Sequence, residues 1–395
     1  MNILIIHNKY GAHSGEETAV YAQRDLLRSH GHQVEEYYRS SEEIQGVGGQ
    51  VNAFFSGFYN RKSEKDIRRL MADPQQPEIV HIHNLYPLIS PSILPILKSP
   101  HHHTTTPPHH HTTTPPPKIV MTVHNYRLIC PNGLFFSHGE ICEACAGGHE
   151  MRCVVKNCED SFSKSAGYAL RNWWARIKRY YLDHVDVFLC LTEFQRTKLI
   201  ENGYPAEKCK VLPNFLDPGD GAPVSGDSSH VLFAGRLNRQ KGFDLLASAA
   251  ARVPDIRFMA AGSPDPLFIQ SVDVPGNLER TGHLPPASLQ HAFVHARFLV
   301  FTSRSYEGFP MVFLEAMKHR LPVIAPDMAG FPEIIEDGFN GLLFKPGDPA
   351  DLANKIRLLW EHEDLCRTLG GNSRHKLLTQ YSPEQYYHQL IKIYS

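Results

Sequence analysis

The sequence contains no apolar run long enough to cross a membrane, because none reaches the roughly 18 consecutive apolar residues of a transmembrane helix. The N-terminus also lacks the basic residues and the small-residue cleavage site of a secretory signal. Its short apolar run, Ile3–Ile6, is typical of a buried first strand instead. We therefore expect a cytoplasmic chain, with the inner face of the membrane as a further location.

The sequence has no excess of either charge. Its 40 Lys and Arg against 41 Asp and Glu leave a formal net charge of −1. No overall field therefore favours nucleic acid as a partner. The eight cysteines occur without a secretory signal, which indicates a reducing compartment. There, metal binding or simple burial of thiols is commoner than disulfide formation.

Short apolar runs alternate with amphipathic stretches along the 395 residues, a pattern that predicts βαβ units and parallel sheets. A Pro-, Gly-, Ser- and Asp-rich stretch near 213–230 interrupts the alternation. We therefore expect an α/β chain of two doubly wound, Rossmann-like domains facing a cleft, 1–212 and 213–375. A C-terminal helix at 376–395 is expected to pack back on the first domain.

The segment 101–116 contains the sequence His-His-His-Thr-Thr-Thr-Pro-Pro twice in tandem. Its six histidines suit a metal, but an exposed low-complexity loop is the interpretation that composition favours. The segment lies where a short turn would be expected, so it is left out of the prediction of the fold.

Two cations follow a predicted strand in the second domain. Arg236 comes just after Val231–Ala234, and Lys241 precedes a predicted helix at Gly242–Arg252. Ligands of doubly wound sheets bind at the carboxyl ends of the strands, where a forked guanidinium and an ammonium suit a diphosphate. The alternative is that both side chains are solvated in a loop.

A second phosphate-binding feature is predicted after the strand Phe298–Phe301. Pro310 suits the first turn of a helix that runs to about His319. The start of such a helix binds anions through its unpaired N–H groups. The groups expected to take part belong to Gly308, Phe309 and Met311.

Two glutamates flank this helix start. Glu315 lies one turn inside the helix and leans back toward its beginning, where it is placed to accept hydrogen bonds from ribose hydroxyls. Glu307 lies in the preceding loop, nearer to a sugar attached to the phosphates. The alternative for Glu315 is a solvated carboxylate, which its apolar neighbours make less natural.

Four elements in this order resemble glycosyltransferase family 4. They are Gly235-Arg236 with Lys241-Gly242, the run from Glu307 to Glu315, Ala329-Gly330-Phe-Pro-Glu333, and Asn340-Gly341-Leu-Leu. The resemblance covers nearly the whole chain, although the first domain matches less tightly. It implies the GT-B fold and retaining transfer of a sugar from a UDP- or GDP-type nucleotide sugar.

The resemblance also implies residue roles. Arg236 and Lys241 would hold the donor diphosphate, Glu315 the ribose and Glu307 the hexose hydroxyls. The relatives often need no metal, since cations and helix dipoles supply the charge stabilisation. The acceptor would be a glycan or a lipid-linked glycan, and the pathway cell-surface polysaccharide assembly.

The first domain carries two matching elements. Gly15 corresponds to the second glycine of a glycine pair that lets the backbone approach the ligand closely, and Ser14 replaces the first. The alternative is a capped helix start with Ser14 as N-cap and Glu17 completing a capping box. His124, after the strand Ile119–Val123, matches a histidine that hydrogen-bonds the transferred sugar; a structural role is its alternative.

A cysteine-rich insertion spans 130–158 and includes a C-x2-C pair, a spacing common in tetrahedral zinc sites. A branch of the family carries cysteines at corresponding positions. They suggest a structural zinc held by Cys130, Cys142, Cys145 and Cys153. Free buried thiols or a disulfide stay open as alternatives.

Aromatic and basic residues alternate over Ala169–Tyr181 on a predicted helix, and more of both lie in Gly57–Arg69. This pattern suits peripheral association with a membrane surface, or equally a helix that packs its tryptophans inward. Two other functions also stay open. One is a nucleotide-sugar epimerase of the same architecture, and the other is a non-catalytic, zinc-stabilised glycan-binding module.

Overall fold

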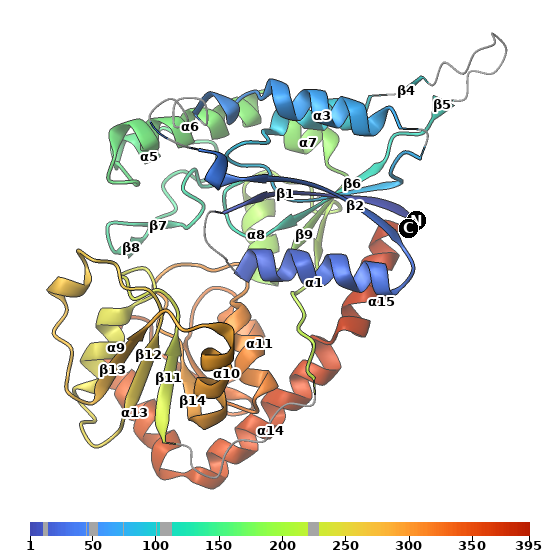
Figure 1. Cartoon of the computed structure of the whole chain (residues 1–395). Coiled ribbons are helices and arrows are strands. Elements are labelled where there is room, and N and C mark those ends of the chain that lie inside the picture. Colours follow the sequence, from blue (N-terminus) through green and yellow to red (C-terminus); the bar gives the residue numbers. More distant parts are fainter. Residues whose placement is uncertain are drawn as a thin grey trace. The chain divides into compact units, whose positions relative to one another are not determined.

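The computed structural model describes residues 1–10, 15–44, 46, 54–73, 75–99, 101–102, 113–219 and 229–395 (Figure 1). These residues form two compact units. The N-terminal unit comprises Met1–Gly133, Glu143–Leu212 and Tyr387–Ser395, and the C-terminal unit comprises Leu134–Cys142 and Pro213–Tyr386. The chain returns to the N-terminal unit at Tyr387 rather than at residue 376, because helix α14 (Glu363–Gln380) still packs against the C-terminal unit.

The N-terminal unit is built on a six-stranded parallel sheet with the order β10-β9-β6-β3-β1-β2. Its first strand is buried along almost its whole length, as expected for a strand covered on both faces. The strands are β1 (Asn2–Lys9), β2 (Gln33–Ser40), β3 (Ile79–Asn84), β6 (Lys118–Val123), β9 (Val187–Cys190) and β10 (Cys209–Val211).

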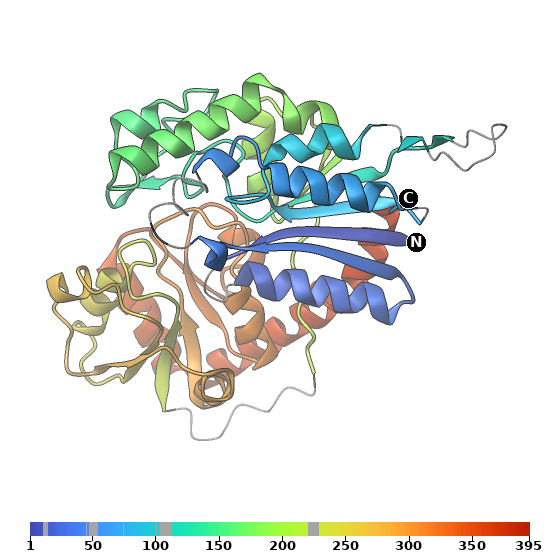
Figure 2. The same ribbon diagram turned by 45° about the horizontal axis from the view of Figure 1, so that its top comes forward.

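Helices cover both faces of this sheet. Helix α1 (Gly15–Ser29) and the end of α15 (Pro383–Tyr394) lie on one face, as Figures 1 and 2 show. On the other face lie α3 (Arg61–Met71), α4 (Leu94–Leu97) and α7 (Tyr180–His184). The cysteine-rich insertion leads through α5 (Arg152–Val155) into α6 (Phe162–Ile177), which precedes α7, and α8 (Glu193–Glu201) connects β9 to β10.

His81 joins three elements at the centre of the N-terminal unit. Its Nδ1 lies 2.9 Å from Nε2 of Gln23 on α1 and 2.6 Å from the hydroxyl of Tyr394 on α15. Its Nε2 lies 2.7 Å from the hydroxyl of Thr122 on β6. Burial lowers the pKa of His81 to about 3, so the ring is neutral. The final helix is thereby fastened to the middle of the sheet.

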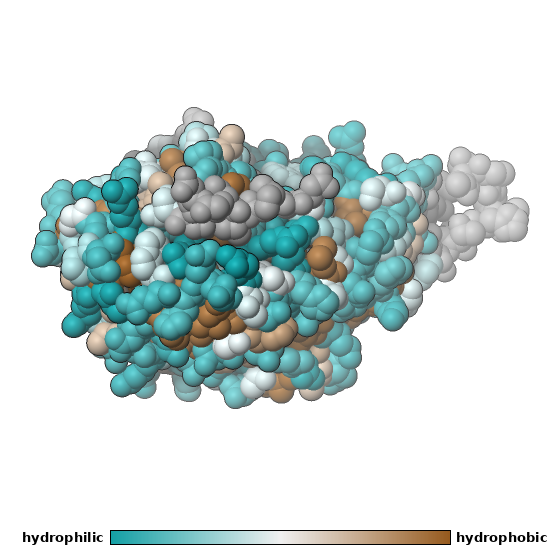
Figure 3. Space-filling view, turned by 90° about the horizontal axis from the view of Figure 1, so that it is seen from below, coloured by the Kyte–Doolittle hydropathy of each residue, from teal (hydrophilic) through white to brown (hydrophobic). Residues whose placement is uncertain are grey.

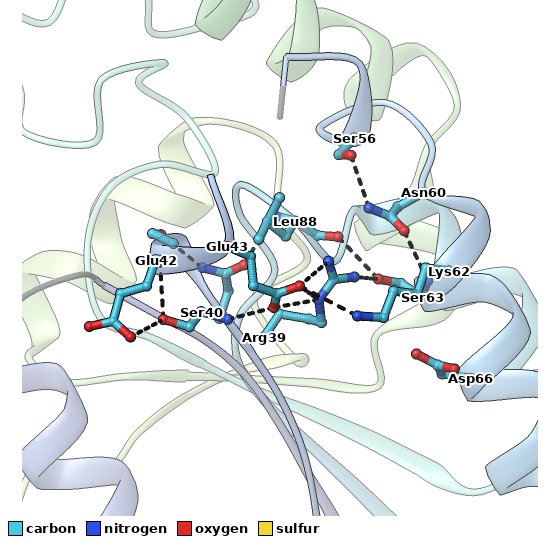
Figure 4. Close-up of polar contacts among 12 residues, drawn as sticks. Arg39, Ser40, Glu42, Glu43, Ser56, Asn60, Lys62, Ser63, Asp66 and Leu88 are labelled. Carbon is cyan, nitrogen blue, oxygen red and sulfur yellow. Dashed lines mark hydrogen bonds and ion pairs between the residues drawn. The ribbon is translucent and has the colours of Figure 1, made fainter. Parts of the chain in front are cut away.

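A network of polar side chains ties the end of β2 to α3 (Figure 4). Arg39 donates from Nε and Nη2 to Glu43, at 2.8 Å each, and from Nη1 to the Ser63 hydroxyl at 3.2 Å. Ser40 and Glu43 form a capping box around the short helix η1 (Ser41–Glu43), and Asn60 caps α3. These contacts fix the exit of β2 against the outer helical layer.

The C-terminal unit contains a second six-stranded parallel sheet with the order β13-β12-β11-β14-β15-β16. The strands are β11 (His230–Ala234), β12 (Phe258–Ala261), β13 (Leu278–Gly282), β14 (Ala296–Val300), β15 (Val323–Pro326) and β16 (Gly341–Phe344). After β11 the chain forms β12 and β13 on one side of β11, and then β14, β15 and β16 on the other side. The strand order therefore reverses between β11 and β14.

Helices α9 (Phe243–Ala250) and α13 (Pro349–Glu361) pack together on one face of this sheet and share a large apolar core with it. Helices α10 (Pro286–His295) and α11 (Met311–Lys318) lie on the other side of the strands (Figure 1), and α12 (Phe331–Ile334) follows β15. Asp348 accepts hydrogen bonds from the N–H groups of Ala350 and Asp351. These two bonds form the N-cap of α13.

Short antiparallel pairs complete the description. Strands β4 (His101–His102) and β5 (Thr113–Thr114) pair within the His/Thr/Pro repeat, the centre of which lies outside the described residues. Strands β7 (Phe136–Ser137) and β8 (Glu140–Ile141) pair within the cysteine-rich insertion. In the part of the chain that the structure describes, no helix has the length and apolarity needed to span a bilayer. The face in Figure 3 is mainly hydrophilic, with small separate apolar patches.

Candidate functional site

The strand order of the C-terminal unit reverses between β11 and β14, and the loops that follow these two strands are bonded to each other. The Gln240 carbonyl accepts from the Arg304 N–H at 2.9 Å, and the Gln240 amide donates to the Ser305 hydroxyl at 3.1 Å. The Thr302 hydroxyl donates to the Lys241 carbonyl at 2.8 Å. Doubly wound sheets bind ligands at such a switch point. The hydrogen bonds hold the two loops together as one surface at the switch point.

Gly242 makes this close approach of the two loops possible. Its φ is 67°, a left-handed conformation that side chains disfavour, and a Cβ there would lie 2.0 Å from the Thr302 carbonyl oxygen. Gly262 is similar, since a Cβ on it would lie 1.8 Å from the Gly235 carbonyl oxygen. The backbone therefore requires a glycine at position 242, beside Lys241, and at position 262, against the Gly235 carbonyl.

Lys241 and Glu307, which the sequence predicted in one donor site, are in contact. The Lys241 ammonium lies 2.8 Å from each carboxylate oxygen of Glu307, and both side chains are largely buried. Arg236 is exposed. Its Nη2 lies 3.3 Å from the Gln240 amide oxygen, and it forms no ion pair with any carboxylate that the structure describes. The loop therefore presents one paired cation and one available cation.

Helix α11 begins beside this ion pair, directly after Gly308, Phe309 and Pro310, all three of which are buried. Pro310 occupies the N-cap position and provides no side-chain cap for the first N–H groups, which begin at Met311. Glu315 lies one turn into the helix and is half-buried. Burial raises the pKa of its carboxyl, and Lys318 partly opposes this shift.

In the N-terminal unit, the ends of β1, β3 and β6 bring together four histidines. His124 was predicted from the sequence; its Nε2 lies 2.8 Å from Nδ1 of His83. The rings of His81 and His83 stack with their centroids 4.6 Å apart, and those of His83 and His124 stack at 5.1 Å. His7 meets His83 edge-on at 6.3 Å.

His7, His81 and His83 are buried, His124 is half-buried, and the four rings are uncharged near neutral pH. Desolvation is the main cause that lowers the pKa of His7 to about 4 and that of His124 to about 3, and it holds the pKa of His83 well below 6.5. Within the described residues, neither ring nitrogen of His7 has a hydrogen-bond partner, nor does Nε2 of His83. The sequence analysis missed His7 and His83, although histidines at three neighbouring strand ends were a usable signal.

Gly15 lies at the first position of α1, so the structure places it at a helix start. The rest of the predicted turn, including Ser14, lies outside the described residues. Glu17 accepts a hydrogen bond from the Tyr10 N–H at 2.9 Å, which ties the helix start to the end of β1. Close approach of a ligand to Gly15 stays a prediction.

The cysteine-rich insertion holds its cysteines as free thiols. Cys145 and Cys153 are buried against Ala169, with Cys158 packed beside them. A hydrogen bond with Cys158, together with burial, raises the pKa of Cys153. Among the residues that the structure describes, no three Cys, His, Asp or Glu are placed to hold a metal ion. Zinc binding by Cys130, Cys142, Cys145 and Cys153 therefore stays a prediction.

Two sequence models of protein families match this chain. Residues 13–220 match the family described as Glycosyltransferase Family 4, and residues 222–376 match Glycosyl transferases group 1. An uncharacterised glycosyltransferase of Methanocaldococcus jannaschii is 34% identical over 201 residues, which cover 50% of this chain and 56% of that protein. D-inositol 3-phosphate glycosyltransferase of a Mycobacterium species is 32% identical over 44% of this chain and 45% of its own length. The chain thus spans about half the length of these curated relatives.

Solved structures share the fold over the whole chain. Anabaena HepE in complex with UDP and glucose has a TM-score of 0.65 at 17% identity, with 100% of this chain and 99% of that one covered. Sucrose-phosphate synthase from Thermosynechococcus elongatus has a TM-score of 0.72 at 16% identity, with 100% and 98% covered. Two Rossmann-like units of the GT-B type are therefore the fold of this chain.

Proposed function

The chain belongs to glycosyltransferase family 4, and we propose that it moves a sugar, with retention of configuration, from a nucleotide sugar to a glycan or lipid-linked acceptor. The observation that carries this proposal is the contact between Lys241 and Glu307 at the switch point of the C-terminal sheet, beside the start of α11. The proposed setting is cell-surface polysaccharide assembly.

The donor diphosphate is proposed to lie between the exposed guanidinium of Arg236, the ammonium of Lys241 and the N–H groups at the start of α11. These groups stabilise the negative charge that develops on the leaving phosphate, and they are already in place before the reaction. Retaining transfer then proceeds on one face of the sugar, and the leaving phosphate helps to deprotonate the acceptor. Transfer is accordingly proposed to continue when metals are chelated.

Glu307 is proposed to bind hexose hydroxyls rather than to attack the sugar. Its two oxygens are both held by Lys241, which fixes the orientation of the carboxylate. A bound diphosphate would give Lys241 a second anionic partner. The carboxylate oxygens of Glu307 could then accept hydrogen bonds from hydroxyl groups of the sugar. Glu315 is proposed to accept hydrogen bonds from the ribose, a site where its buried carboxyl regains polar partners.

On the N-terminal unit, His124 is proposed to hydrogen-bond the transferred sugar. Because its pKa is far below neutrality, His124 acts as a neutral hydrogen-bonding group and not as a cation. Its contact with His83 fixes which ring nitrogen faces outward, since one of the two rings must donate the hydrogen. His83 is therefore proposed as the residue that orients His124.

The test is to measure binding of UDP, GDP, ADP and their common sugar conjugates by calorimetry. A single preferred nucleotide is expected to bind, and Glu315→Ala should weaken it by roughly tenfold or more, the cost of about one hydrogen-bonded carboxylate. Lys241→Ala should mainly lower the turnover number. Arg280→Ala, an exposed arginine on β13, is the matched control and should leave binding and turnover unchanged.

Nucleotide release is then followed with and without candidate acceptors. Release that depends on an acceptor supports a transferase, whereas release of the nucleotide and a free sugar without one supports the epimerase. If Glu315→Ala and Lys241→Ala bind donor and turn over as the unchanged chain does, the proposed donor site is wrong.

Association with a membrane surface is proposed for α6. Phe162, Leu170, Trp173 and Ile177 are exposed along one side of this helix, and basic side chains such as Lys178 lie beside them. Vesicles of anionic phospholipid should sediment the chain, and Trp173→Ala should reduce the bound fraction. Leu378→Ala, an exposed leucine on α14, is the control. Equal sedimentation of both variants would exclude α6 as the contact.

A further inference from the structure

Two arginines lie against one tyrosine ring inside the N-terminal unit. Arg171, on α6, is only 4% exposed, and its guanidinium carbon lies 3.8 Å from the ring centroid of Tyr86 and 4.6 Å from that of Tyr168. The guanidinium carbon of Arg127 lies 5.5 Å from the same Tyr168 ring. Two like charges are thus held close together in a region of low polarity.

Among the residues that the structure describes, neither guanidinium has an ion-pair partner. Nε and Nη2 of Arg171, and Nε of Arg127, are buried and have no hydrogen-bond partner in the described part of the chain. Neither arginine forms an ion pair with a described carboxylate. The undescribed segments of the N-terminal half contain no Asp or Glu that could serve instead.

Two carboxyls act on Arg127 without forming an ion pair with it. Glu16 and Glu159 both interact electrostatically with Arg127, but burial is the larger effect and raises the pKa of each. The pKa of Glu16 reaches about 8, so this carboxyl is mostly protonated near neutral pH. Within the described residues, neither guanidinium therefore has an ionised carboxylate in ion-pair contact, although Arg127 interacts electrostatically with Glu16 and Glu159.

Such an arrangement costs stability. Burying a guanidinium without an ionised partner is expensive, and the contacts with Tyr86 and Tyr168 recover only part of that cost. Arg127 brings a second positive charge, and its repulsion together with desolvation lowers the pKa of Arg171. Unbalanced buried charge of this kind marks places that are completed by a ligand.

A cavity of about 480 Å³ is lined by Arg127, whereas Arg171 lies against Tyr86 of the cavity wall, and every residue that lines the cavity belongs to the N-terminal unit. Arg127 and Tyr86 line it, and both are neighbours of Arg171. Asn172 also lines it, and the Asn172 amide holds the Arg127 carbonyl at 2.5 Å. The cavity is large enough for a phosphate or diphosphate group together with an attached sugar.

We propose that Arg127 and Arg171 form a binding site for a phosphate or diphosphate group in the N-terminal unit. A guanidinium fork matches phosphate oxygens, and two forks match a diphosphate. If the proposed transferase function holds, this group belongs to the acceptor, and the site orients the acceptor independently of the donor diphosphate bound at Lys241. The group is carried either by a lipid headgroup or by a soluble phosphorylated glycan.

The test uses the full chain carrying Trp360→Phe, because the two remaining tryptophans, Trp173 and Trp174, both lie on α6 of the N-terminal unit. Thermal unfolding is followed by their fluorescence in pyrophosphate and in sodium chloride of equal ionic strength. At a hundredfold excess over Kd, pyrophosphate should raise the melting temperature by roughly 5–10 °C. Arg171→Met should remove this rise, whereas Lys241→Ala should keep it.

The ligand-free variant provides a second readout. Without anions, Arg171→Met should melt at the same temperature as the unchanged chain or above it, because it removes an unbalanced buried charge. A purely structural arginine would instead lose stability. Arg127→Met is a second variant that should also lose the pyrophosphate effect if Arg171→Met folds poorly. An equal pyrophosphate rise in both variants and the unchanged chain would overturn the proposal.

A vesicle assay distinguishes the two possible carriers of the phosphate group, a lipid headgroup and a soluble glycan. Phosphatidylcholine vesicles with phosphatidic acid are compared with phosphatidylcholine alone. Loss of the phosphatidic acid-dependent binding in Arg171→Met assigns the site to a lipid headgroup. Retained vesicle binding, with the pyrophosphate rise lost, assigns it to a soluble phosphorylated glycan. Neither assay needs a donor, so the site can hold even if the proposed transferase function fails.

Discussion

Lowering the pH from 7 to 5 should destabilise the N-terminal unit through its histidine cluster. Burial lowers the folded pKa of His7, His81, His83 and His124 below 6.5, so each contributes stability that is complete above pH 6.5 and is lost as the pH falls toward the folded pKa, which is about 4 for His7 and about 3 for His81 and His124. Each histidine that stays unprotonated in the folded state lowers the free energy of unfolding by about 1.9 kcal/mol between pH 7 and pH 5. Glu16 has the opposite effect, because its folded pKa is raised to about 8. It increases the free energy of unfolding by about 2.5 kcal/mol between pH 7 and 5.

The net loss is about 5 kcal/mol, a large part of the 5–15 kcal/mol that stabilises an ordinary domain. Urea unfolding at pH 7, 6 and 5 measures it, with Trp360→Phe restricting the fluorescence signal to the N-terminal unit. The chain with Trp173→Phe and Trp174→Phe reports instead on the C-terminal unit through Trp360. That unit has only two histidines with lowered pKa values, His230 and His319, so its loss should be smaller.

His83→Gln sharpens the measurement. Glutamine keeps a hydrogen-bonding group for His124 but cannot take up a proton in this range, so the loss between pH 7 and 5 should shrink by about 2 kcal/mol. An unfolding free energy of the N-terminal unit that stays constant within about 1 kcal/mol from pH 7 to 5 would refute this reasoning.

Three further predictions concern other parts of the chain. Gly242→Ala would place a methyl group against the Thr302 carbonyl at positive φ, so it should destabilise the C-terminal unit by about 2 kcal/mol or more in urea unfolding followed through its tryptophan. Hydrogen bonds from Arg39 lower the pKa of Glu43 to about 2, so this pair stabilises above pH 4.3 or so and is lost as the pH falls toward 2. Glu43→Gln should therefore cost up to about 1 kcal/mol at pH 7 and almost nothing at pH 2. Elemental analysis is expected to find about one zinc per chain, reduced in Cys153→Ser; a metal-free preparation with an ordered insertion would contradict it.

The central strands of both sheets could be predicted from the sequence, whereas three strands at sheet edges could not. Ile3–Ile6 lies within β1 and Val231–Ala234 within β11, and both strands are buried by layers on either face. The missed strands β2, β13 and β16 are all outermost in their sheets. An edge strand is partly solvated, so β2 carries two glutamates and an arginine and has no continuous apolar run.

Some features of the candidate site could likewise be predicted from the sequence, and others could not. The sequence predicted Lys241 and Glu307 in one donor site, and the structure brings them into contact because β11 and β14, the strands before their loops, are adjacent. The stacking of His83 on His124 and the meeting of Arg127 with Arg171 depend on side-chain packing between distant segments. No local pattern in a single sequence encodes such contacts.

The N-terminal unit is discontinuous in the chain, and this affects how the protein can be divided. Its last piece begins at Tyr387, whose ring stacks on His30 at 3.6 Å, and ends beside Tyr394, which holds His81. A fragment that stops at Leu212 would leave buried polar groups without their partners. A chimera that takes its C-terminal unit from a relative must therefore retain residues 387–395 from the same parent as residues 1–212. Recombination of these halves thus requires two crossovers rather than one.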